Sequence, residues 1–129
     1  MKLNYKFLNT ITALGSLING LFYLLAPGFS LSLLGQTAAP IGLMNTRVAG
    51  AIALGVCVIN WTSRNIQEFH IKRIVSAGNL TMFTLLVLVE LHGTLTGAMN
   101  WVGWLFILAD SLLAIGYFIY LLRLYGSSD

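Results

Sequence analysis

The order of apolar and polar positions divides the chain into four long apolar stretches separated by short polar breaks. The stretches cover residues 7–25, 43–62, 74–91 and 101–122. Each is close to the ~20 apolar residues that an α-helix needs to cross a hydrocarbon core about 30 Å thick. Backbone amides cannot stay unpaired in lipid, and the alternation typical of a membrane β-barrel is absent, so we expect helices. The pattern predicts an all-α, single four-span membrane domain over residues 1–129.

The breaks between the stretches predict how the helices are connected. Residues 26–28 read Ala-Pro-Gly and end the first helix, because proline has no amide hydrogen and glycine has no side chain. Residues 29–35 are apolar but too short to span, so we expect a segment along the membrane interface. The second break, 63–73, is markedly charged, whereas the third, 93–100, is an uncharged tight turn. These features predict an antiparallel, up-down four-helix bundle with a short interfacial segment after the first helix.

Composition places the chain in the same class. Of its 129 residues, 57% are hydrophobic and 9% are charged, whereas a soluble domain has about 25% charged residues. This composition excludes a water-soluble globule and a disordered segment. Seven basic residues outnumber four acidic ones but form no patch or stripe, so we expect no nucleic-acid partner. The single cysteine, Cys57, lies in an apolar run and cannot form an intramolecular disulfide.

The placement of lysine and arginine predicts the orientation of the spans. If four spans alternate in direction, six basic residues fall on one side of the membrane and Arg47 falls toward the other. The six are Lys2, Lys6, Arg64, Lys72, Arg73 and Arg123. Loops rich in lysine and arginine stay in the cytoplasm. We therefore expect a multi-pass protein of the plasma or inner membrane with both termini cytoplasmic.

Polar residues recur at helical spacing inside the spans and predict which faces point into the bundle. Five polar residues of the first span are separated by three or four positions and share one helix face. These are Asn9, Thr12, Ser16, Asn19 and Tyr23. The corresponding face of the second span carries Arg47, Gly50, Ala51, Leu54 and Val58. That of the third span carries Asn79, Phe83, Leu86 and Glu90, and that of the fourth carries Asn100, Gly103, Ile107, Asp110, Ala114 and Tyr117. Small residues allow close helix contact, and amides and hydroxyls of this kind usually bond to a neighbouring helix.

Arg47, Glu90 and Asp110 are ionisable residues inside the spans, where a central charge costs about 2.5–3.5 kcal/mol on insertion scales. Arg47 and Glu90 lie roughly 3–6 Å inside the outer boundary, so a bidentate pair can join the second span to the third. Asp110 lies near the middle of the bilayer. Arg47 cannot pair fully with both acids, and desolvation favours the neutral form of an acid without a partner. We expect Asp110 to be protonated at neutral pH or to share Arg47 with Glu90.

The candidate site is therefore a cluster of polar residues inside the membrane that could hold a ligand. Its members are Arg47, Glu90, Asp110, Asn19, Asn79 and Asn100. No metal site is predicted, because about 33 Å of helix separates His70 from His92 and they cannot share a ligand. P-loop, G-x-G-x-x-G, H-E-x-x-H and nucleophile-elbow motifs are absent from the sequence. The sequence therefore identifies no catalytic residue and no evident cofactor.

Three segments carry a resemblance to a known family. They are residues 24–28 (Leu-Leu-Ala-Pro-Gly), 34–35 (Leu-Gly) and 47–55 (Arg-Val-Ala-Gly-Ala-Ile-Ala-Leu-Gly). In these features the chain resembles the DoxX-like class of small four-helix membrane proteins. The resemblance implies a four-helix membrane fold; the namesake is linked to quinone-reducing thiosulfate oxidation, and relatives are thought to be subunits of larger membrane complexes. No cysteine-based or metal-binding motif of such an enzyme is found in this sequence.

Two functions are compatible with these features, and a third, cofactor-dependent electron transfer, ranks below them because the chain has no paired histidines. The favoured one is a non-catalytic subunit or scaffold of a larger membrane complex, with other membrane chains or a second copy as partners and a lipid or quinone held between its helices. The small size, the short loops and the absence of a soluble site support it. The alternative is a membrane-embedded enzyme or a proton-coupled transport element that uses Arg47, Glu90 and Asp110.

Overall fold

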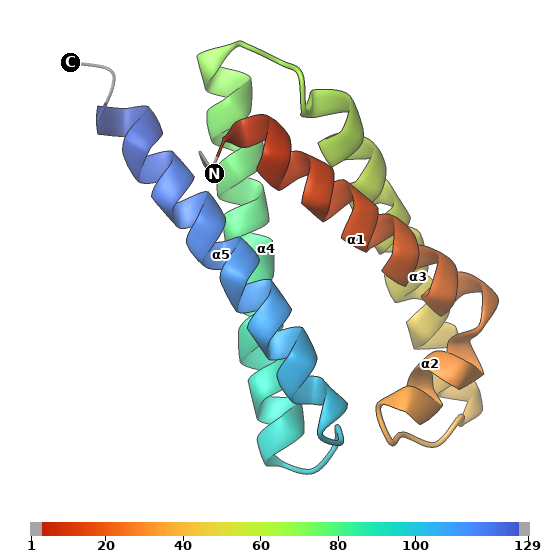
Figure 1. Cartoon of the computed structure of the whole chain (residues 1–129). Helices are drawn as coiled ribbons and strands as arrows, with labels where there is room; N and C mark the ends of the chain where they lie inside the picture. The colour runs from red at the N-terminus through yellow and green to blue at the C-terminus, as the bar shows by residue number, and fades with distance from the viewer. Residues whose placement is uncertain (1–3, 127–129) are drawn as a thin grey trace.

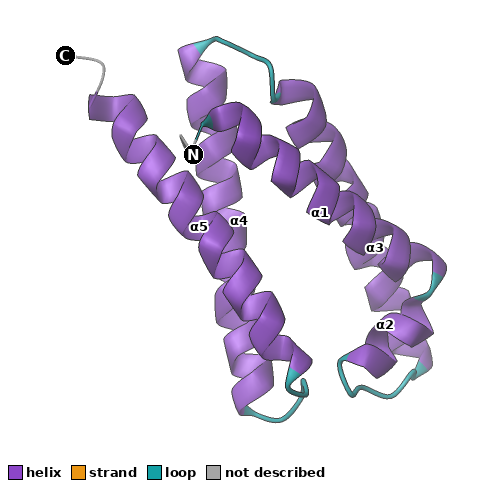
Figure 2. Cartoon of the chain, viewed as in Figure 1, coloured by secondary structure: helices purple, strands orange, loops and turns teal. Residues whose placement is uncertain are grey.

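The computed structural model describes residues 4–126, and this part of the chain consists of helices and their connections (Figure 1). The helices are α1 (Tyr5–Leu25), α2 (Pro27–Leu33), α3 (Pro40–Ser63), α4 (Phe69–Leu95) and α5 (Val102–Gly126). Figure 2 shows no strand in the described part of the chain. α1, α3, α4 and α5 are long and apolar enough to cross a membrane. The predicted all-α four-helix bundle is confirmed, and α2 is the short segment expected after the first span.

The local sequence explains where several helices begin. Asn4 precedes α1, and its Oδ1 accepts a hydrogen bond of 2.8 Å from the backbone amide of Phe7, which would otherwise have no partner. Pro27 and Pro40 are the first residues of α2 and α3. At this position the missing amide hydrogen costs nothing and the fixed φ already suits a helix. α4 begins at Phe69, earlier than residue 74 where the predicted span starts, because the charged residues before the span continue the helix.

The distribution of side chains is the reverse of that in a soluble domain. Polar side chains are buried among the helices, notably Asn9, Thr12, Asn60, Ser76 and Asn79. Large apolar side chains cover the outside of the molecule, where Leu25, Val89 and Trp101 are 76%, 69% and 70% exposed. Such a surface is unfavourable in water and favourable in lipid, where the scarce polar groups must find partners inside the bundle. The chain is therefore a small multi-pass membrane protein.

The long helices associate as two antiparallel pairs, α1 with α3 and α4 with α5. In Figure 1 the two pairs approach each other where α1 begins and diverge toward α2. The contact within the first pair depends on Gly20 and Gly50. A Cβ atom at Gly50 would lie 2.8 Å from the Leu24 backbone nitrogen and 2.9 Å from the Gly20 carbonyl oxygen. The absence of side chains therefore lets the backbones of α1 and α3 touch.

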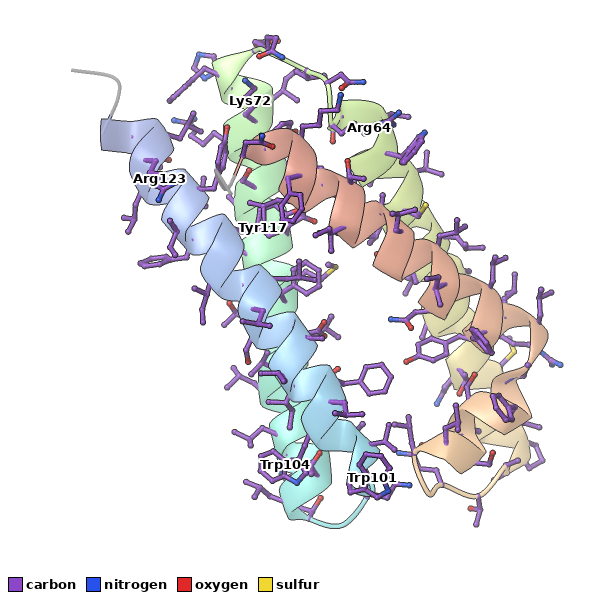
Figure 3. The ribbon with its side chains drawn as sticks, viewed as in Figure 1. Arg64, Lys72, Trp101, Trp104, Tyr117 and Arg123 are labelled. Carbon is purple, nitrogen blue, oxygen red and sulfur yellow. The ribbon has the colours of Figure 1, made fainter. Side chains whose placement is uncertain are left out.

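Three basic residues and two of the tryptophans lie at opposite ends of the bundle. Figure 3 shows Arg64, Lys72 and Arg123 at the end where α1 begins and α5 ends, and Trp101 and Trp104 at the other end. We call these the basic end and the tryptophan end. Of the basic residues assigned to one side from the sequence, Lys2 lies outside the described residues.

Candidate functional site

A buried network of hydroxyl and amide groups joins all four long helices near the basic end. The Tyr117 hydroxyl of α5 donates a 2.8 Å hydrogen bond to Asn9 Oδ1 of α1 and lies 2.9 Å from Thr12 Oγ1. Since its hydrogen points to Asn9, Tyr117 accepts from Thr12. Asn60 of α3 and Asn79 of α4 donate to each other's side-chain oxygen, and the two donor–acceptor distances are 3.3 and 2.6 Å. Tyr117 Oη also lies 3.4 Å from Asn60 Oδ1, which links both halves of the network.

A second contact joins the helix pairs at the tryptophan end. The backbone amide of Asn100 donates a 2.9 Å hydrogen bond to the Leu34 carbonyl, and its side-chain amide donates one of the same length to the Leu33 carbonyl. Gly35 has a φ of +77°, which favours glycine, and a Cβ atom there would lie 3.2 Å from the Cβ of Asn100. The segment after α2 is thus fastened to the turn before α5.

Between these two contacts a half-open cavity of about 350 Å³ lies between the helix pairs. Its lining is mainly apolar and includes Ala53, Val56, Phe83, Leu86, Phe106 and Leu113. Its polar groups are Thr12, Ser16, Asn19, Tyr23, Glu90 and Asp110. A second cavity of about 250 Å³ shares Asn19, Tyr23 and Phe106 with the first and extends to α2. An apolar space with a few convergent polar groups is the usual form of a small-molecule site.

Glu90 of α4 and Asp110 of α5 form the most unusual feature of this cavity. Both carboxyl groups line the same cavity, together with Tyr23 of α1. Glu90 Oε2 is buried and has no hydrogen-bond partner in the described part of the chain. Two adjacent carboxylates repel each other strongly where water is scarce. The pair therefore needs a proton or another cation between its oxygens.

Arg47 lies outside this site. Its side chain is exposed, and it does not line the cavity. The reason is the orientation of α3, whose Gly50 face packs against α1 while Ala53 lies at the cavity. The expected pair between Arg47 and Glu90 is not formed, and neither acid shares Arg47.

The structure divides the six predicted site residues among four places. Asn19, Glu90 and Asp110 lie together at the cavity. Asn79 belongs to the buried network, and Asn100 belongs to the contact at the tryptophan end. The polar face predicted for the first span lies at the cavity, where Thr12, Ser16, Asn19 and Tyr23 form one wall.

Asn60 is a site residue that was not singled out from the sequence. It is 1% exposed and bonds to Asn79 across the interface between the two helix pairs. The signal that could have found it is its amide, because a polar side chain within the span 43–62 needs a partner inside the bundle. Its face of α3, which also carries Ala53 and Val56, was not recognised because those two residues are apolar.

Within residues 4–126, no group of three or more His, Cys, Asp or Glu side chains is arranged to hold a metal ion. Comparison of the chain with protein-family models, with curated proteins and with solved structures finds no match. The fold and the site define a four-span membrane protein with a cavity between its helix pairs that is lined by two carboxyl groups.

Proposed function

We propose that the chain is a subunit or scaffold of a larger membrane complex and that it holds a lipophilic ligand, a lipid or a quinone, between its helix pairs. The observation that carries this proposal is the cavity of about 350 Å³ bounded by α1, α3, α4 and α5. Its volume lies within the range of roughly 300–1,000 Å³ found for ligand pockets. The α1 wall offers hydroxyl and amide groups to a polar headgroup, α4 and α5 add the carboxyl groups of Glu90 and Asp110, and the remaining lining suits a ring or chain.

The surroundings of the cavity favour a ligand that arrives from the bilayer. Ile52 of α3 and Leu86 of α4 line it and are 63% and 38% exposed. The cavity therefore reaches the outer surface between the two helix pairs, where lipid chains surround the protein. A ligand can place its headgroup at the polar wall and leave its tail among these chains.

The shape of the protein supports a role as subunit or scaffold. The connections between the long helices are short, and apolar side chains cover the outside of all four. Partner chains, or a second copy, would therefore make their main contacts inside the membrane. The resemblance to the DoxX-like class supports the same role, and we propose that family assignment with it.

The placement of charge supports an orientation with both termini in the cytoplasm. Arg64, Lys72 and Arg123 lie at the basic end with the beginning of α1 and the end of α5 (Figure 3). Lysine and arginine close to membrane spans favour the cytoplasmic side.

Filling the cavity tests the proposed ligand binding. The protein is extracted from its membrane into nanodiscs, and bound lipids and quinones are identified by native mass spectrometry. Ala53→Phe places a ring in the cavity, whereas Ala51→Phe places the same ring on an exposed position of the same helix. We expect the wild type and Ala51→Phe to retain a specific lipid or quinone and Ala53→Phe to lose it. Equal retention in all three proteins contradicts the proposal.

The alternative function, an enzyme or a proton-coupled transport element, draws support from the placement of Glu90 and Asp110 in one cavity. Arg47 does not belong to that arrangement because it is exposed and lies outside the cavity. A transport role would therefore depend on the two acids alone.

A further inference from the structure

We infer that the cavity selects a lipophilic cation, such as an amine or quaternary ammonium with an apolar tail, and that this cation replaces a proton at Glu90 and Asp110. The inference rests on the proposed function, because it names the charge class of the ligand that the same cavity would bind.

The charges around the cavity point to a cation. Among the described residues that line the two cavities, Glu90 of α4 and Asp110 of α5 are the charged side chains, and Tyr23 of α1 is the remaining titratable one. The lining residues of α2 and α3 carry no charge. Since Arg47 is outside, the described lining of the cavities offers no positive group to balance the acids or to attract an anion. A ligand that brings positive charge therefore gains most at this site.

The buried oxygen of Glu90 shows where the charge would sit. Oε2 has no hydrogen-bond partner within the described chain, although it is shielded from the surroundings. A buried acceptor without a partner is costly, and a cation or a proton beside it removes that cost. The headgroup would therefore lie between the carboxyl groups of Glu90 and Asp110.

The remaining lining favours an organic cation over a metal ion. The rings of Tyr23, Phe83 and Phe106 line the cavity and can contact an alkylammonium group through their faces. A small inorganic ion needs many oxygen ligands to replace its water, and the apolar walls do not provide them. A quaternary ammonium headgroup has no N–H group and is weakly hydrated, so it loses less hydration free energy on entering than a small inorganic ion does.

The length of the cavity suits a headgroup with part of a chain. Its α1 wall runs from Thr12 to Tyr23, about 16 Å along the helix. The exposed lining residues Ile52 and Leu86 mark the side through which the rest of the chain would extend into the bilayer.

Ligands with one tail and different headgroups test this inference. The protein in phosphatidylcholine nanodiscs is titrated calorimetrically with decyltrimethylammonium, decyl sulfate, decanol and a decyl-substituted quinone, with empty nanodiscs as the blank. We expect saturable binding of decyltrimethylammonium at least about tenfold tighter than that of decyl sulfate. Titration in two buffers of different ionisation enthalpy should show proton release by the wild type, a measurement that requires no variant.

Substitutions locate the binding. Asp110→Asn and Glu90→Gln should each weaken decyltrimethylammonium binding about tenfold or more and abolish the proton release. Glu68→Gln, at an exposed position before α4, removes the same charge elsewhere and should leave both unchanged. Binding that is equal for the cationic and anionic ligands, or that persists unchanged in both cavity variants, overturns the inference.

The outcomes also separate this inference from the proposed function. Specific binding of decanol or the quinone, lost in Ala53→Phe, without preference for the cation supports the proposed function and refutes the cation selectivity. If no ligand binds saturably and Ala53→Phe changes nothing, both proposals fail.

Discussion

The Tyr117 hydroxyl donates a 2.8 Å hydrogen bond to Asn9 Oδ1 and so ties the last long helix to the first across 108 positions of the chain. Tyr117 is fully buried and its ring stacks on Phe83 of α4. The same hydroxyl contacts Thr12, which lines the cavity, so the network forms the cavity's boundary toward the basic end. Together with the contact at Asn100, it holds two separate helix pairs around a common space.

Removal of this hydroxyl should weaken the bundle. In Tyr117→Phe the ring remains, but Asn9 and Thr12 lose a partner in a region without water. Hydrogen bonds between membrane helices contribute about 0.6 kcal/mol on average and about 1.7 at most, so we expect a loss of about 1 kcal/mol. Thermal unfolding in detergent measures it. Tyr120→Phe is the matched control, because Tyr120 of the same helix makes a ring contact with Tyr5 and its hydroxyl makes no hydrogen bond to another residue of the described range 4–126. An equal loss in both variants would contradict the assigned role.

The close contact between α1 and α3 predicts that alanine substitution affects stability differently at Gly50 and Gly55, two glycines of α3. A Cβ atom at Gly50 would lie 2.8 Å from the Leu24 backbone nitrogen, whereas one at Gly55 meets nothing within 4 Å. Gly50→Ala should therefore force the helices apart and cost about 1–3 kcal/mol. Gly55→Ala should leave stability unchanged or raise it slightly, since alanine favours helices. Equal unfolding temperatures for the two variants would show that α1 and α3 do not pack as described.

The sequence was sufficient to predict the fold because the membrane restricts backbone structure to helices and the apolar stretches are long. Regular spacing also brings Thr12, Ser16 and Asn19 of α1 to the same cavity, although Asn19 is exposed rather than buried in the bundle. The rotation of α3 was not predictable in the same way. Its polar residue Arg47 suggested one inward face, but the close contact at Gly50 turns a different, apolar face toward the cavity. Steric fit between helices, which single-helix patterns do not encode, decided that rotation.

The orientation of the spans can be tested with single cysteines in a Cys57→Ser background. Gln67→Cys lies in the connection at the basic end, and Ala98→Cys lies in the turn at the tryptophan end. Arginine and lysine near Gln67 should keep that end in the cytoplasm. A membrane-impermeant thiol reagent applied to whole cells should therefore label Ala98→Cys at once and Gln67→Cys only after permeabilisation. The reverse pattern would place the termini outside.

Arg47 provides a test of the arrangement of the site itself. If Arg47 joined α3 to α4 through an ion pair with Glu90, its replacement would leave a buried carboxylate unpaired and lower the free energy of unfolding by about 3–5 kcal/mol. In the structure its side chain is exposed and outside the cavity, so Arg47→Gln should change the free energy of unfolding by no more than about 0.5 kcal/mol. Binding of a lipophilic ligand should also remain unchanged. Thermal unfolding and the calorimetric titration measure both quantities on one preparation. A large loss of stability or of ligand affinity would show that Arg47 belongs to the site.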